Sequence, residues 1–61
     1  MTTNKAAAVV NMQFNDKSFK KDKIYDFRYE EDGSVCIISE EKKEQLLTFQ
    51  EFDMLFKILA N

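Results

Sequence analysis

The chain has 61 residues, which is enough for one small domain, and its formal net charge is −2. It contains no histidine, one cysteine (Cys36) and one glycine (Gly33). These counts exclude a histidine-dependent catalytic triad, a glycine-rich phosphate loop, an intramolecular disulfide and a zinc or iron–sulfur centre built by this chain alone. We therefore expect a protein that is not an enzyme and that uses no metal or cofactor.

The first part of the chain predicts a strand followed by a loop. Residues 1–4 are polar, and we expect them to be disordered ahead of a single domain over residues 5–61. Residues 5–14 carry apolar side chains at every second position, which predicts a strand, although the run of alanines leaves a helix open. Residues 15–23 are polar except for Phe19, which predicts a loop whose phenylalanine folds back onto the core.

The middle of the chain predicts three more strands. Residues 24–29 alternate aromatic and charged side chains, and the Asp32-Gly33 pair that follows is a strong hairpin signal. Residues 35–39 are β-branched and nearly all apolar, which favours a central strand covered on both faces, with Cys36 as a small buried residue. Residues 44–47 predict a short fourth strand.

The end of the chain predicts a helix. Thr48 and Glu51 have the spacing of a capping box, in which each side chain accepts a hydrogen bond from the backbone amide of the other residue. The residues that follow show the i, i+3, i+4, i+7 spacing of one helical stripe, namely Phe52, Leu55, Phe56 and Leu59. We expect the helix to reach the end of the chain and to carry a second apolar flank of Phe49, Met54 and Ile58.

These elements predict an α+β fold that is rich in β-structure. We expect a small curled antiparallel sheet of about four strands in the order β-β-β-β-α, with the C-terminal helix closing its open side. Residues 1–29 carry six basic against three acidic side chains (+3), and residues 30–61 carry three against eight (−5). Opposite sides of the surface are therefore expected to differ in electrostatic potential.

A basic segment with nearby aromatics leaves two interpretations open. Lys20, Lys21 and Lys23 lead into the predicted strand that carries Tyr25 and Tyr29. In small barrels, aromatics on a strand stack nucleic-acid bases while lysines hold the phosphates. The competing interpretation places these aromatics in the core, and the acids at 30–32 would repel a phosphate backbone. The acids of residues 30–44 also suggest a DNA-mimicking surface, for which a net charge of −2 is thin support.

Three segments resemble small SH3-like barrel proteins encoded by bacteriophages and prophages. They are residues 19–27 (FKKDKIYDF), 32–38 (DGSVCII) and 47–52 (LTFQEF), so the resemblance spans residues 19–56. The chain departs from that pattern at Asp22, where those proteins usually have glycine, and its predicted terminal helix is longer than theirs. The resemblance implies an SH3-like barrel and a virus-encoded accessory protein that acts by binding, often to a host protein. That family has no single function, so no binding residue carries over.

We therefore expect a non-catalytic protein-binding module, for example a phage-encoded inhibitor or regulator of a host protein. The alternatives are a small nucleic-acid-binding barrel and a self-assembling structural component such as a homodimer. The candidate contact residues are Lys20, Lys21, Lys23, Tyr25, Tyr29, Phe49, Met54 and Ile58. No signal peptide or membrane span is visible, and a lone thiol favours a reducing compartment, so we expect the cytoplasm, which is the host's if the protein is viral.

Overall fold

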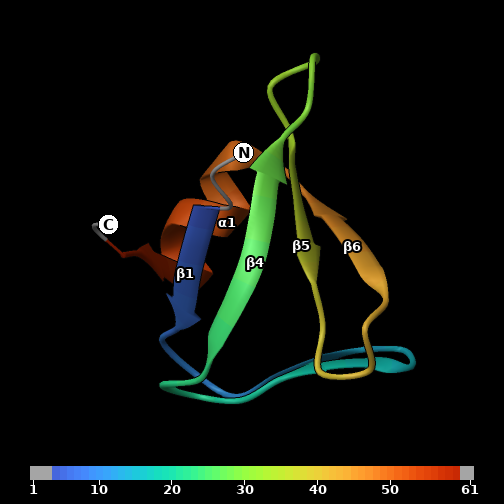
Figure 1. Ribbon diagram of the computed structural model, residues 1–61, viewed down its shortest axis with the longest axis vertical. Helices are drawn as coiled ribbons and strands as arrows, with labels where there is room; N and C mark the ends of the chain where they lie inside the picture. Colours follow the sequence, from blue (N-terminus) through green and yellow to red (C-terminus); the bar gives the residue numbers. More distant parts are fainter. Residues whose placement is uncertain (1–3, 60–61) are drawn as a thin grey trace.

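Within residues 4–59, which the computed structural model describes, the chain forms seven strands and one short helix (Figure 1). Five strands make an antiparallel sheet in the order β6-β5-β4-β1-β7: β6 (Glu44–Leu47), β5 (Val35–Ile38), β4 (Ile24–Tyr29), β1 (Asn4–Ala8) and β7 (Phe56–Ile58). A separate two-stranded hairpin pairs β2 (Met12–Phe14) with β3 (Lys17–Phe19). The helix, α1 (Phe49–Leu55), joins β6 to β7.

The predicted fold class is wrong in its architecture. The expected sheet of about four strands closed by a C-terminal helix is instead a five-stranded sheet with an additional two-stranded one. The large sheet does not close into a barrel, because β6 and β7 each pair with one neighbour only. The helix has seven residues and is followed by a strand, so the order β-β-β-β-α does not describe this chain.

The helix ends at Leu55 because the next residues complete the sheet. Phe56 takes extended φ and ψ angles of −133° and 153°, and β7 then pairs with β1 through Ala8↔Phe56 and Ala6↔Ile58. A helix of two turns is only marginally stable by itself. Continuing it beyond Leu55 would therefore add less stability than the hydrogen bonds that pair β7 with β1. The extended backbone also directs the Phe56 ring into the core. Leu59 is therefore not part of a helical stripe, and residues 60–61 lie outside the described residues.

The predicted strand over residues 5–14 divides in two. A bend at residues 9–10 separates β1 from β2, and the alternative of a helix at the alanines is wrong. Asn4, expected to be disordered, pairs with Phe27 as the first residue of β1, while residues 1–3 lie outside the described residues. The predicted loop contains β3, which turns back through Asn15 at a φ of 56°, a conformation that asparagine tolerates better than most residues.

The remaining local predictions are confirmed. β4 and β6 have the predicted bounds, and β5 ends one residue earlier than predicted, at Ile38. Gly33 supplies a φ of 91° in the hairpin between β4 and β5, which a side chain would disfavour. Phe19 is buried in the core, as expected for a plug, and Cys36 is buried in β5 between β4 and β6. Thr48 and Glu51 form both hydrogen bonds of the capping box.

Aromatic rings fill the core above two alanines of β1. Ala6 and Ala8 point inward from the strand between β4 and β7, and their small side chains leave room for rings from the neighbouring elements. Phe19 contacts Tyr25 and Phe56 edge-on, with ring centroids 5.0 and 5.3 Å apart. Phe52, the buried residue of α1, joins this group through Phe56 at 5.5 Å and Phe27 at 4.7 Å. The helix is thus anchored by one buried ring, which packs against the rings of Phe27 and Phe56.

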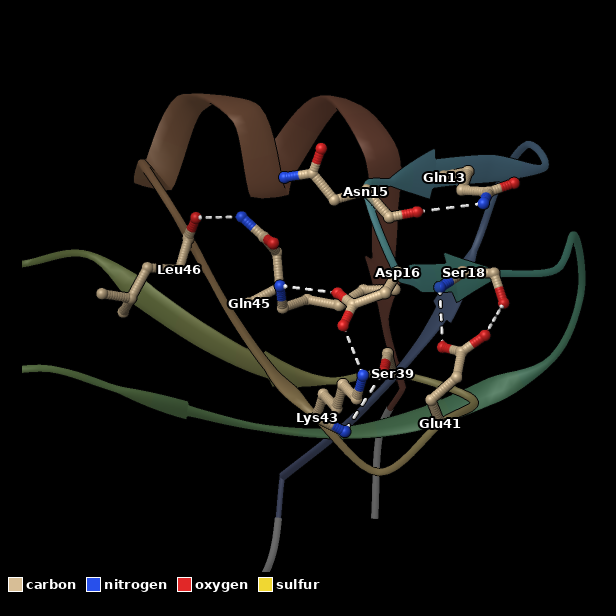
Figure 2. Close-up of polar contacts among 10 residues, drawn as sticks. Gln13, Asn15, Asp16, Ser18, Ser39, Glu41, Lys43, Gln45 and Leu46 are labelled. Carbon is tan, nitrogen blue, oxygen red and sulfur yellow. Dashed lines mark hydrogen bonds and ion pairs between the residues drawn. The ribbon is translucent and has the colours of Figure 1, made fainter.

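Polar contacts hold the β2–β3 hairpin against the turn between β5 and β6 (Figure 2). The carboxylate of Glu41 accepts hydrogen bonds from the backbone amide of Ser18, at 2.8 Å, and from its hydroxyl. The amide of Glu40 donates to the carbonyl of Ser18 at 3.0 Å, and the ammonium of Lys43 pairs with Asp16. These bonds lower the pKa of Glu41, mainly through the Ser18 hydroxyl, and that of Asp16, mainly through Lys43, each to about 2.

We predict that Phe52→Ala removes most of the stability of the protein, whereas Phe49→Ala on the same helix has little effect. Phe52 is 1% exposed, and such a truncation costs about 3–5 kcal/mol. A domain of this size has a total stability of roughly 3–9 kcal/mol. Phe49 is 52% exposed, so we expect its loss to cost about 0.5 kcal/mol or less. Urea unfolding followed by circular dichroism measures both. Equal losses for the two variants would show that the ring of Phe52 does not anchor α1.

We predict that acid loosens the β2–β3 hairpin before the sheet melts. The folded-state pKa values of Asp16 and Glu41 lie below their ordinary values of 3.8 and 4.5. Their stabilising contribution is therefore complete above those values and is lost as the pH falls towards about 2. Glu41→Gln should lower the Tm at neutral pH and make little further difference near pH 2. A Tm difference from wild type that is the same at both pH values would contradict this, and Glu31→Gln serves as the matched control.

Candidate functional site

Charged side chains separate towards the two ends of the molecule. Residues 29–34 and 46–53 carry five acids and no lysine or arginine. Residues 15–23 and 39–43 carry six lysines against four acids. Figure 1 shows the tip of the β4–β5 hairpin projecting at one end, with residues 15–23 and 39–43 at the other. In these segments the lysine-rich end thus carries a net charge of +2 (6 − 4) and the acidic end −5, although residues 39–43 come from the half of the chain that was expected to be acidic.

The acidic end presents two hollows that flank the tip of the hairpin. One is lined by Glu30, Glu31, Asp32, Ser34 and Leu46. The other is lined by Asp32, Gly33, Ser34, Thr48 and Phe49. Since they share Asp32 and Ser34, the two hollows form one continuous area, and we call these eight residues the hairpin-end surface. Each hollow combines acidic or polar groups with one large apolar side chain.

Hydrogen bonds within the turn hold the acidic tip in one shape. One carboxylate oxygen of Asp32 accepts from the amide of Ser34 at 3.0 Å and from its hydroxyl at 2.7 Å. These bonds, the hydroxyl first, lower the pKa of Asp32, so its charge is kept in mildly acidic solution. The amide of Glu30 donates to the carbonyl of Ser34 at 2.8 Å and closes the hairpin. The conformation of the tip is therefore fixed by hydrogen bonds within the turn.

Two large apolar side chains stand out from this surface. Leu46 is 60% exposed and Phe49 is 52% exposed. Leu46 lies near the end of β6, and its carbonyl accepts a hydrogen bond from the Gln45 side chain at 3.0 Å (Figure 2). Phe49 is the first residue of α1, directly after the capping box of Thr48. Strand pairing and the helix cap thus fix the backbone that positions both side chains.

The predicted basic and aromatic contact residues do not come together. Lys20, Lys21 and Lys23 lie at the lysine-rich end, just before β4. Tyr25 is only 6% exposed; its ring packs in the core, and its hydroxyl donates to Glu40 at 2.6 Å while accepting from the Lys20 amide. Burial, reinforced by Glu40, raises the pKa of Tyr25 to about 12. Tyr29 is exposed but lies at the other end of β4, directly before the acids.

The predicted apolar flank is exposed but is not a single stripe. Phe49, Met54 and Ile58 all present large parts of their side chains to solvent. Phe49 and Met54 are five residues apart on α1, which places them about 140° apart around the helix axis. Ile58 belongs to β7 rather than to the helix. Of these three residues, only Phe49 lines the hairpin-end surface.

Leu46 is the exposed apolar residue of this surface that sequence reasoning missed. A signal was present, because successive residues of a strand point to opposite faces, so Leu46 and Leu47 are both buried only if both faces of β6 are covered. Leu47 is the buried one of the pair. Cys36, by contrast, is buried as expected, and burial raises the pKa of its thiol, which disfavours the nucleophilic thiolate.

No helix within residues 4–59 has the length and hydropathy needed to cross a membrane. Comparison of the chain with protein-family models, with curated proteins and with solved structures gave no match. A function for this chain has to be inferred from its own surface.

Proposed function

We propose that this chain is a non-catalytic protein-binding module that inhibits or regulates another protein through its hairpin-end surface. The observation that carries the proposal is the pair of exposed side chains, Leu46 and Phe49, on either side of a hydrogen-bonded turn. Protein interfaces commonly have an apolar centre, enriched in aromatic side chains, inside a polar rim.

The energy available from these two anchors is sufficient to matter. Fully burying a leucine or phenylalanine side chain is worth about 1.5–3 kcal/mol, and each of these is already near half covered. Completing their burial therefore contributes roughly 1–1.5 kcal/mol each, or close to a hundredfold in affinity together. A preorganised surface loses little conformational entropy on binding, so more of this energy is expressed as affinity.

The alternative of a nucleic-acid-binding barrel has less support. It needs aromatic faces beside lysines, whereas the Tyr25 ring is buried and Tyr29 lies next to Glu30 and Glu31. The resemblance to phage-encoded proteins implies a viral origin and a host target, and that stays a prediction. A reducing cytoplasm also remains a proposal, which the single buried thiol of Cys36 supports.

We predict that replacing both anchors removes binding of the partner without unfolding the chain. The tagged wild type should retain a near-stoichiometric protein from bacterial lysate, and Leu46→Ser/Phe49→Ser should retain about tenfold less or worse. The matched control is Ile24→Ser/Met54→Ser, which removes two apolar side chains that are also more than half exposed but lie outside the hairpin-end surface. Circular dichroism checks that all three chains are folded. Absence of a partner on the wild type, or equal loss in the control, would refute the proposed function.

A further inference from the structure

We infer that the hairpin-end surface recognises a basic segment of its partner, a stretch in which lysine or arginine stands beside an apolar residue. This inference rests on the proposed function and adds the chemistry of the occupant. It follows from the hydrogen bonds and ion pairs that the acidic side chains of this surface make, and do not make, with the rest of the described chain.

The acids of the hairpin tip are left with unused hydrogen-bonding capacity. Within residues 4–59, no lysine or arginine lines either hollow. Arg28 is the nearby cation, and its guanidinium is already engaged with Glu30, at 2.8 Å, and with Glu44, at 3.2 Å. Asp32 uses one carboxylate oxygen for Ser34, while Glu31 forms no ion pair or hydrogen bond within the described residues. The side chains of Glu31 and Asp32 can therefore accept further donors.

The apolar anchors, Leu46 and Phe49, determine which groups must lie beside a cationic donor of the partner. Leu46 shares a hollow with Glu30, Glu31 and Asp32, and Phe49 shares one with Asp32. A free metal ion or polyamine would satisfy the acids and leave both anchors in water. A segment with a guanidinium or ammonium group next to an apolar side chain satisfies both requirements at once, and a guanidinium can bind a carboxylate through two parallel hydrogen bonds.

Other partners fit this surface less well. A phosphate backbone or an anionic membrane would be repelled by the acids. A two-fold dimer through the same patch would bring the acids of both copies together, because such an interface is self-complementary. A head-to-tail contact with the lysine-rich end of a second copy is compatible in charge, and the experiment below separates it from a peptide segment.

The test is selection of random peptides displayed on phage against the immobilised wild-type chain, with counter-selection on Leu46→Ser/Phe49→Ser. We expect the enriched peptides to be rich in arginine or lysine next to leucine, isoleucine or an aromatic residue. Binding of one enriched peptide, labelled with fluorescein, is then measured by anisotropy. It should weaken about tenfold in Glu31→Gln/Asp32→Asn, a variant that keeps the side-chain shapes but removes two charges. Raising the salt concentration should weaken wild-type binding further.

The control is Glu51→Gln/Asp53→Asn, which changes the net charge equally at two residues that line neither hollow. Glutamine also preserves the capping box at residue 51. We expect its affinity to stay within about twofold of wild type.

Enriched peptides that are neutral or acidic, or an unchanged affinity in Glu31→Gln/Asp32→Asn, would overturn the inference while leaving the proposed function intact. Failure to enrich any peptide that depends on Leu46 and Phe49 would overturn both. Dimerisation in sedimentation experiments that Glu31→Gln/Asp32→Asn abolishes would assign the surface to a second copy and overturn the basic-segment inference.

Discussion

The packing of aromatic rings against the alanines of β1 is the constraint on which the rest of the structure depends. Ala6 and Ala8 offer almost no volume, so rings from β3, β4, α1 and β7 can meet above the strand. The contacts run from Phe19 to Phe56 and on to Phe52, which ties the two-stranded hairpin and the helix to the sheet. A chain of this size has few alternative ways to bury apolar surface, so each ring carries a large share of the stability.

This core also explains why the two ends of the molecule differ. At the lysine-rich end, the hydroxyl of Tyr25 leaves the core to meet Glu40, and Ser18 meets Glu41, so polar groups from separate segments satisfy one another. At the hairpin end, the hydrogen bonds of the turn are local, and the β4–β5 tip extends beyond the core. Leu46 and Phe49 stay largely exposed there, and the side chain of Glu31 has no hydrogen-bond or ion-pair partner within residues 4–59. Hydrogen bonds between separate segments of the chain therefore stabilise the lysine-rich end, whereas those of the hairpin tip are confined to one turn.

Sequence patterns identified only part of the candidate site. Phe49 was identified as surplus apolar surface, because it lies outside the stripe that contains Phe52. Leu46 was overlooked, although successive strand residues point to opposite faces, so two adjacent leucines are both buried only where both faces of the strand are covered. The grouping of Leu46 and Phe49 around Asp32 was beyond sequence reasoning, because it depends on β5 placing the hairpin tip beside the end of β6. Lys20, Lys21 and Lys23, by contrast, precede β4 and Tyr29 ends it, so the length of the strand separates them.

The sequence by itself determined the elements whose causes lie within a few residues. The cap at Thr48, the turn at Gly33 and the strands Ile24–Tyr29 and Glu44–Leu47 follow from side-chain hydrogen bonding, φ preference and alternation. Only the tertiary structure decided that the helix stops at Leu55 and that the last described segment is a strand. The stop depends on an unpaired edge of β1 and on room for one more ring beside its alanines. Those two conditions are created by residues at the opposite end of the chain, and no pattern confined to a short window reports them.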